Sequence, residues 1–397
     1  MKIESLTHLA MGRAEDGTLV PRVLPDEVIE LTDDGARVLT PSPDRVRPMC
    51  SHYKACGGCS MQHASDQFVA EWKADIARRA LAAQNISVDI EAVLTSPASS
   101  RRRAKFSGKR TKKGALVGFH ARASDTIVEI PNCTLLTPGL LAFLPALREL
   151  TVMSASRKAE IGLTVTETLN GPDVHIDTDR EITEDLRLSL AGWANENGVA
   201  RLVWADEPIV MINPPVQKFA EVEVVPPAGA FLQATKHGEQ VLQTAVQNRI
   251  GAVSKVVDLF AGSGTFSLPM AATAEVHAVE GLRDMMDALN ASWRKSSGLK
   301  QVTTETRDLF KRPLLPDELN EFDAAIIDPP RAGALAQIGE LASSKLKKVC
   351  MVSCNPVTFA RDARILIDAG FEIGPLTVVD QFRWSAHVEL VALFTRT

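Results

Sequence analysis

Residues 349–356, V-C-M-V-S-C-N-P, join an expected strand to an expected helix. The apolar run at 349–352 predicts a buried strand, and the segment 358–366 repeats apolar side chains at the spacing of one helix face. Asn355 can cap that helix, and Pro356 suits its first position. This strand and helix belong to a longer alternation in the last third of the chain.

The last third alternates strand-like and helix-like segments. Its strand-like runs begin near residues 255, 275, 301, 323, 347, 376 and 387. Such alternation predicts a doubly wound α/β fold, in which helices cover both faces of a parallel sheet. Because ligands bind these sheets at the carboxyl ends of the strands, functional residues are expected along that edge.

Cys354 follows one of these strands directly. Unpaired amides and the dipole at a helix N-terminus favour an anion, so its thiol is expected to ionise easily and to be a plausible nucleophile. The alternative is a small packing residue. That is the interpretation of Cys350, which falls in the middle of the same strand.

The composition is that of a soluble protein. With 397 residues, 45% of them hydrophobic, the chain can build two or three cored domains. It begins without a signal-peptide pattern, and no apolar run approaches the length of a membrane span. We therefore expect a cytoplasmic protein without membrane contact, and no obligate protein partner is evident. A net charge of −5 gives no global reason to expect a nucleic-acid partner.

Three regions are expected. Residues 1–47 read as short strands broken by turns and end at a proline-rich linker. Residues 48–228 form a β-rich central domain with helical stretches at 138–150 and 182–198. Residues 229–397 form the α/β domain. The central strands are expected near 114–120, 125–130, 161–166, 173–177, 201–204 and 208–212.

Cys50, Cys56 and Cys59 form the pattern C-x5-C-G-G-C, and Cys133 is a fourth candidate ligand. In a reducing compartment, closely spaced cysteines more often bind metal than form disulfides. The two glycines let the backbone wrap around one centre. Structural zinc sites space their paired cysteines two to four residues apart, so an iron–sulfur cluster competes with zinc here.

Residues 101–113, R-R-R-A-K-F-S-G-K-R-T-K-K, contain eight basic residues and no acid. Such a run can be a solvated surface loop, but it also supplies the charge that a phosphate backbone needs. We expect it to contact phosphate.

Residues 258–266, D-L-F-A-G-S-G-T-F, form a glycine-rich turn after the first strand of the α/β domain. Such a turn lets a ligand approach the backbone. Glu280 ends the next strand, 22 residues after Asp258, where an acid can bind ribose hydroxyls. The third glycine of a dinucleotide fingerprint is missing, and so is a P-loop. These features predict a cofactor that contains a nucleoside.

Asp328 ends the fourth strand of this domain, in D-P-P-R. The two prolines stop the strand ladder and hold the carboxylate in place. Asp-Pro-Pro can also be a simple strand terminator. Its coincidence with the glycine-rich turn and Cys354 on one sheet edge favours a function.

Together these motifs resemble the RNA uracil-C5 methyltransferase family. The cysteine pattern resembles the iron–sulfur branch of that family, which includes the 23S ribosomal RNA (uracil-5-)-methyltransferases. Residues 1–45 resemble a shortened TRAM domain, the OB-like RNA-binding barrel of the family. The matching motifs are F-L-Q at 231–233, D-L-F-A-G-S-G-T-F at 258–266, V-E at 279–280, I-I-D-P-P-R at 326–331, V-S-C-N-P-x-T-x-A-R-D at 352–362 and H-V-E-L-V at 387–391.

The resemblance implies a class I, Rossmann-like methyltransferase domain and assigns roles to its residues. Cys354 is implied as the nucleophile that adds to C6 of a flipped-out uracil, and Glu389 as the base that removes the C5 proton. The implied contacts to S-adenosylmethionine are Gln233, Phe260, Gly262, Gly264, Glu280, Asp308 and Asp328. The implied ligands of a [4Fe-4S] cluster are Cys50, Cys56, Cys59 and Cys133.

The chain departs from the family pattern at residues 380–387, where D-Q-F-R-W-S-A-H replaces the more usual D-x-F-P-x-T-x-H. Ala234-Thr235 and Thr265 are further departures. The expected function is methylation of a uridine in structured RNA, with 23S ribosomal RNA as the preferred substrate and a structural cluster. Transfer RNA is the nearer alternative substrate. An inactive, metal-stabilised RNA-binding protein is the alternative from another class.

Overall fold

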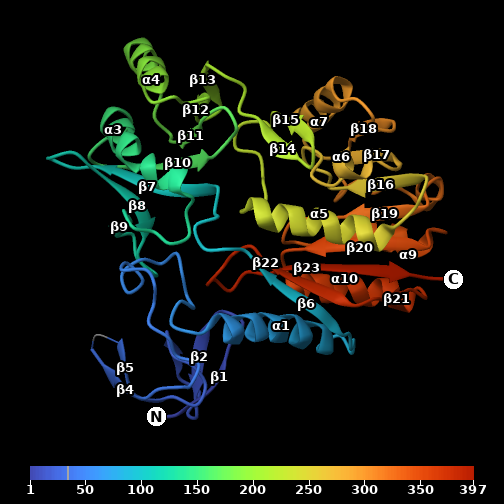
Figure 1. The fold of residues 1–397 in the computed structure, drawn as a ribbon, viewed down its shortest axis with the longest axis horizontal. Helices are drawn as coiled ribbons and strands as arrows, with labels where there is room; N and C mark the ends of the chain where they lie inside the picture. Colours follow the sequence, from blue (N-terminus) through green and yellow to red (C-terminus); the bar gives the residue numbers. More distant parts are fainter. Residues whose placement is uncertain (34) are drawn as a thin grey trace.

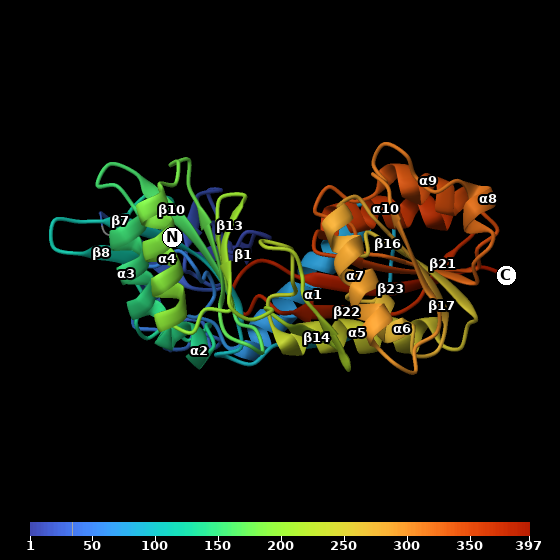
Figure 2. The same ribbon diagram turned by 90° about the horizontal axis from the view of Figure 1, so that it is seen from above.

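The computed structural model describes residues 1–33 and 35–397, which form two lobes (Figures 1 and 2). One lobe holds the amino-terminal strands and the central sheet. The other holds the carboxyl-terminal sheet and its helices, together with one helix and one strand from the first quarter of the chain.

A nine-stranded sheet forms the carboxyl-terminal lobe, in the order β18-β17-β16-β19-β20-β23-β22-β6, with β21 paired to β23. The strands are β16 (Lys255–Leu259), β17 (Glu275–Glu280), β18 (Val302–Thr306), β19 (Ala324–Ile327), β20 (Lys348–Ser353), β21 (Glu372–Ile373), β22 (Leu376–Asp380), β23 (Glu389–Thr395) and β6 (Ile90–Thr95).

The doubly wound α/β prediction holds for the five strands β16 to β20, which pair in parallel. The expectation of an entirely parallel sheet is wrong, because β23 runs antiparallel to both β20 and β22. Only eight residues, 381–388, connect β22 to β23. A connection this short joins antiparallel neighbours, since a parallel pair needs a longer crossover.

Helices cover both faces of this sheet, and each face has its own hydrophobic core. One core packs against α5 (Lys236–Ile250), α6 (Ser267–Met270) and α7 (Arg283–Lys295). The other packs against α1 (Asp66–Ala82), α8 (Pro316–Leu319), α9 (Leu335–Ser343) and α10 (Pro356–Asp368).

The predicted start of α10 is confirmed. Asn355 is the N-cap, its side chain accepts a hydrogen bond from the Val357 amide at 3.1 Å, and Pro356 is the first helical residue. Cys354 thus lies between the end of β20 and a capped helix.

Strand β6 and helix α1 lie outside the region where the sequence places them. The sequence assigns both to the central domain of residues 48–228, whereas β6 pairs in parallel with β22 and α1 packs over that edge of the sheet (Figure 1). Their partners lie about three hundred residues away along the chain, so no local pattern reports the pairing.

The central sheet has seven strands in the order β13-β12-β11-β10-β7-β8-β9. Helices α2 (Pro138–Ala142), α3 (Leu144–Ser154) and α4 (Glu184–Glu196) pack against it (Figure 2). Both predicted helical stretches and the six predicted strands, which correspond to β8 to β13, are present, and β7 is an additional strand within the basic run. The strands are β7 (Arg103–Arg110), β8 (Ala115–His120), β9 (Ile127–Glu129), β10 (Glu160–Thr166), β11 (Asp173–Asp177), β12 (Arg201–Trp204) and β13 (Glu207–Met211), and a hairpin of β14 (Gln217–Phe219) and β15 (Val222–Val224) follows.

The amino-terminal region consists of a three-stranded sheet and a hairpin. Strands β1 (Ile3–Leu6), β2 (Met11–Ala14) and β3 (Leu19–Pro21) form the sheet, and β4 (Val28–Thr32) pairs with β5 (Gly35–Thr40). Asp34, within the expected barrel region, lies outside the described residues. Nowhere in the described chain is a helix both long and apolar enough to cross a bilayer.

Candidate active site

A cavity of about 400 Å³ opens at the carboxyl edge of the parallel strands. The loops after β16, β17, β18, β19 and β20 contribute to its wall, so the expected sheet edge is the place where the predicted residues meet. Of the nine predicted catalytic and cofactor-binding residues, eight line it: Gln233, Phe260, Gly262, Glu280, Asp308, Asp328, Cys354 and Glu389.

Gly264 is the predicted residue that does not line the cavity. Its φ is +98°, and an added Cβ would lie 2.9 Å from Leu289, so this position requires glycine to close the turn against α7. Gly262 also has a positive φ, and its amide donates to Glu280 at 3.2 Å. The Leu282 amide donates to the other oxygen of Glu280 at 3.1 Å, which fixes this carboxylate at the cavity wall.

Aromatic side chains form part of the cavity. The rings of Phe260 and Phe310 lie 5.4 Å apart, and Phe231 is 65% exposed at the opening. Phe310 was missed by the sequence reasoning, because it belongs to no quoted motif, and Phe231 opens the F-L-Q motif but was not named as a site residue. Flat apolar faces beside fixed carboxylates suit a ligand with a nucleobase and a ribose.

Cys354 lies in the cavity wall near Glu389, Asp328 and Arg331. Burial, together with the charges of Glu389 and Asp328, raises the pKa of its thiol to about 12, against a smaller opposing effect of Arg331. The prediction of an easily ionised thiol is therefore wrong for the ligand-free protein. The helix N-terminus is present, but desolvation and two acidic neighbours outweigh it.

Two carboxyl groups in this cavity also have raised pKa values. Burial, aided by the charge of Asp328, raises the pKa of Glu389 to about 8, and the hydrogen bond from Gln381 opposes this shift. Burial raises the pKa of Asp328 to about 7. Groups that titrate near neutrality in a cavity are suited to accept or donate a proton during a reaction.

Asp258 lies beneath the glycine-rich turn, and it was not among the predicted site residues. It accepts a hydrogen bond from Ser267 at 2.5 Å, while its other oxygen has no hydrogen-bond partner among the described residues. Burial raises its pKa to about 7. Its place at the end of β16 could have been read from the sequence, since Asp258 opens the motif.

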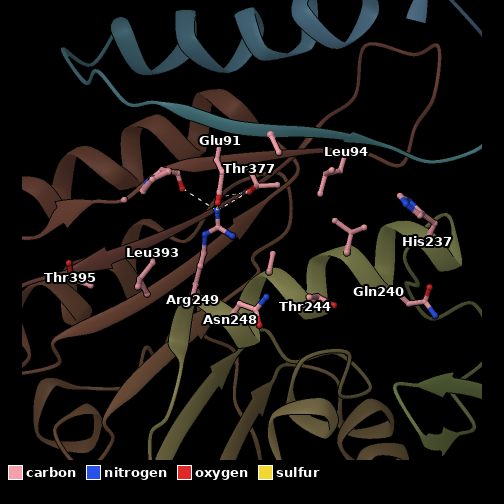
Figure 3. A pocket seen from close by; sticks show the side chains of 15 residues that line it. Glu91, Leu94, His237, Gln240, Thr244, Asn248, Arg249, Thr377, Leu393 and Thr395 are labelled. Atoms are coloured by element: carbon pink, nitrogen blue, oxygen red, sulfur yellow. Dashed lines mark hydrogen bonds and ion pairs between the residues drawn. The ribbon is translucent and has the colours of Figure 1, made fainter. Parts of the chain in front are cut away.

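A larger cavity of about 700 Å³ lies between α5 and the edge strand β6 (Figure 3). Arg249 points from α5 toward Glu91 and Thr377 there and donates to both, at 2.7 and 2.8 Å. Cys354 and Glu389 do not line this cavity. It is distinct from the site that gathers the predicted residues.

The four predicted metal ligands lie near one another, in the loop before α1 and in the loop after β9. Burial, together with smaller effects of Cys133, Cys56 and Cys50, raises the pKa of Cys59 to about 12. Gln62 donates to Cys59 Sγ at 3.2 Å. Across residues 1–33 and 35–397, however, no three His, Cys, Asp or Glu side chains have the arrangement of a metal site.

The backbone around these cysteines is closely packed. The Gly57 amide donates to the His120 carbonyl at 2.9 Å, and an added Cβ on Gly57 would lie 2.9 Å from that oxygen. The Gly58 amide donates to Cys56 Sγ at 3.3 Å. Thiols that receive N–H donors from a tight loop fit the chemistry of an iron–sulfur cluster, although their present spacing is not that of ligands.

The basic run of residues 101–113 divides into an interior part and an exposed part. Arg102 is buried and pairs with Glu239 at 2.5 Å, and Arg103 donates to the Gly229 carbonyl at 2.9 Å, so both join the two lobes. The run was read as a surface patch because the alternation of β7 is hidden among charged residues. Its exposed end consists of Arg110, Lys112 and Lys113.

The chain is similar in sequence to known RNA methyltransferases. The family model described as tRNA (Uracil-5-)-methyltransferase matches residues 226–397. An RNA methyltransferase of Caulobacter vibrioides is 42% identical over 99% of this chain and 100% of its own length. The 23S rRNA (uracil(1939)-C(5))-methyltransferase RlmD of Shewanella woodyi is 31% identical over 99% of this chain and 95% of its own length.

A solved structure shares the fold over the whole chain. The Pyrococcus abyssi tRNA (uracil-54, C5)-methyltransferase, in complex with S-adenosyl-L-homocysteine, superimposes with a TM-score of 0.78 at 20% identity, covering 99% of this chain and 98% of that one. This likeness shows the shared fold, and the two relatives of 42% and 31% identity show the family over 99% of the chain. The chain belongs to the RNA uracil-C5 methyltransferase family.

Proposed function

We propose that this protein uses S-adenosylmethionine to methylate C5 of a uridine in RNA, with 23S ribosomal RNA as the substrate. One observation carries the proposal: Cys354 and Glu389 line the same cavity as the turn at Gly262 and the carboxylate of Glu280. A nucleophile and a base thus lie beside a site suited to a nucleoside cofactor.

The cofactor site follows from the cavity wall. Glu280, held by two backbone amides, is placed to accept hydrogen bonds from ribose hydroxyls. Phe260 and Phe310 offer apolar faces to a base, and Gln233, Asp308 and Asp328 supply the polar contacts. When bound there, S-adenosylmethionine supplies an electrophilic methyl group.

The chain's own residues carry the other steps. Cys354 first loses its thiol proton to solvent, and the resulting thiolate Sγ bonds to C6 of the uracil, which moves electrons toward C5 and makes that carbon the nucleophile for the methyl group. Glu389 then takes the C5 proton as the C5–C6 double bond re-forms and the C6–Sγ bond breaks. The target base must leave its stack, because C6 is not accessible within a helix.

We further propose that Cys50, Cys56, Cys59 and Cys133 hold a [4Fe-4S] cluster. Their mutual proximity, their burial and the N–H donors to Cys56 and Cys59 support this. The raised pKa values of Cys56, Cys59 and Cys133 mean that metal binding releases protons. No step of the reaction above requires an electron, so the cluster's role is structural.

The substrate proposal rests on similarity to the 23S rRNA enzyme over 95% of that enzyme's length. The test is methylation of ribosomal and transfer RNA from cells that lack the gene, followed by nucleoside analysis. We expect 5-methyluridine at a ribosomal position. Methylation of transfer RNA alone would overturn the substrate, and no 5-methyluridine in either RNA would favour the inactive RNA-binding alternative.

A further inference from the structure

Gln381 lies buried in the active site, between the loop of Gln233 and the start of β23 at Glu389. It follows the last residue of β22 and is only 3% exposed. Its side chain reaches the loop of Gln233 and Ala234 on one side and Glu389 on the other. It stands in the stretch where the chain departs from the family pattern, and the proposed mechanism gives it no role.

The orientation of the Gln381 amide is fixed by the backbone. The Ala234 amide donates to Gln381 Oε1 at 2.7 Å. A backbone N–H can only donate, so the atom that faces it must be the oxygen. The amide nitrogen of Gln381 therefore faces away from Ala234.

Both hydrogens of that nitrogen have acceptors. One points to Glu389 Oε1 at 3.1 Å, and the other to Gln233 Oε1. Gln233 also lines the cavity, and because its oxygen accepts from Gln381, its amide nitrogen remains as the donor of this side chain. A single buried side chain thus sets the orientation of one cavity residue and donates to another.

The groups around Glu389 have opposite effects on the charge of its carboxyl group. Asp328, from the end of β19, disfavours a charge on Glu389, whereas Arg331 favours it. Cys354, after β20, lies near enough for Glu389 to raise its pKa. Gln381 adds a direct hydrogen bond that favours the carboxylate over the protonated acid.

The backbone around Gln381 is held firmly. Lys73 pairs with Asp380 and also donates to the carbonyls of Phe382, at 3.2 Å, and His387, at 2.9 Å. On the facing helix α5, a Cβ added to Gly238 would lie 2.7 Å from the Cβ of Gln381. Close packing against α5 and the hydrogen bonds of Lys73 therefore hold the Gln381 side chain in one position.

We infer that Gln381 is a positioning residue, which keeps Glu389 ready to accept the C5 proton and turns the amide nitrogen of Gln233 toward the cofactor. The inference rests on the proposed function and adds to it a residue that acts through two others. If Gln381 acts in this way, replacing it changes the pH profile of methylation and slows proton removal. A glutamine that only stabilised the fold would change neither.

The test compares Gln381→Met and Gln381→Glu with wild type and with Gln337→Met. Gln337 is a suitable control, because it is fully buried and exchanges two hydrogen bonds with the Leu314 backbone, away from the cavity. Three quantities are measured: methylation rate against pH, affinity for S-adenosylmethionine, and the fraction of protein found covalently attached to RNA during turnover.

For Gln381→Met we expect the rising limb of the pH profile to move up by about one pH unit, with a fall of roughly tenfold at pH 7. The covalent fraction should rise, because proton removal slows more than adduct formation, and cofactor affinity should fall. Gln381→Glu should shift the profile further, since it brings a second carboxyl group to Glu389.

If the pH profiles and covalent fractions of both Gln381 variants match those of Gln337→Met, the inference is overturned and the proposed function stands. A wild-type protein that makes no 5-methyluridine would overturn the proposed function and the inference with it. Should Gln381→Met fail to fold, Gln381→Glu keeps the side-chain size and the acceptor for Ala234, and an unshifted profile there would contradict the inference as well.

Discussion

Cys354 and Glu389 lie opposite each other, one position beyond the last pair of the antiparallel strands β20 and β23, Ser353 and Leu390. Because β23 runs antiparallel to β20, the start of β23 lies beside the end of β20. If β23 ran parallel to β20, its start would lie at the opposite edge of the sheet. The mixed sheet is thus the reason why the proposed nucleophile and the proposed base share one cavity.

Replacing the base tests this pairing. Glu389→Gln keeps the size of the side chain but cannot accept the C5 proton, so turnover should fall by about 10² to 10⁴. The variant should still form the bond from Cys354 to C6 and should accumulate a covalent protein–RNA complex with ordinary uridine. Denaturing gels measure the complex. Its absence from Glu389→Gln with a normal turnover rate would assign the base to another residue.

The raised pKa of Glu389 predicts a pH dependence. Its pKa is about 8, and the carboxylate is the form that accepts a proton, so the rate should rise as the pH increases from 6.5 through 8. A rate limited by proton removal follows this curve, which single-turnover assays at saturating cofactor record. A rate already constant between pH 5 and pH 7 would mean that Glu389 titrates at its ordinary value.

Lys73 and Asp380 form an ion pair with both side chains fully buried. Lys73→Met leaves the carboxylate of Asp380 buried without its partner, so the free energy of unfolding should fall by about 3 to 5 kcal/mol. Urea denaturation measures this change. As a control, Glu71→Ala breaks the exposed pair of Glu71 with Arg78 and should cost about 0 to 1 kcal/mol. Equal losses in the two variants would contradict the importance of burial.

The four cysteines predict an iron content. Cys59→Ser should lose iron, sulfide and visible absorbance, and should unfold at a lower temperature, because metal binding contributes to folding. Cys350→Ala is the matched control, since Cys350 is buried within β20 among apolar residues. Wild-type protein that is colourless after anaerobic purification and contains zinc would overturn the iron–sulfur proposal and retain the metal site.

The exposed end of the basic run predicts a contact with phosphate. Reversing the charges of Arg110, Lys112 and Lys113 should weaken RNA binding and reduce the slope of log affinity against log salt by about 2. Lys255→Glu is a control, because Lys255 begins β16 at the far edge of the sheet from the cavity. An unchanged salt slope in the triple variant would remove this hairpin from the RNA-binding surface.

The elements that local patterns specify were predictable from the sequence. The capped helix α10 and the central strands β8 to β13 follow from residues close in the chain, as does the glycine-rich turn at Gly262, whereas β7 was not predicted. Strand β6 could not be placed, because its partner β22 is distant in sequence. Side-chain environments were also hidden. Burial and acids from other strands suppress the ionisation of the Cys354 thiol, and Gln381 stands at a variable position of its motif.

The most direct test of the central claim is covalent capture with RNA that contains 5-fluorouridine, whose C5 substituent cannot leave as a proton. In the presence of S-adenosylmethionine, wild-type protein should form a complex whose mass equals protein plus RNA plus one methyl group, and Cys354→Ala should form none. A complex that persists in Cys354→Ala, or a folded wild-type protein that forms none with the RNA it methylates, would contradict the account.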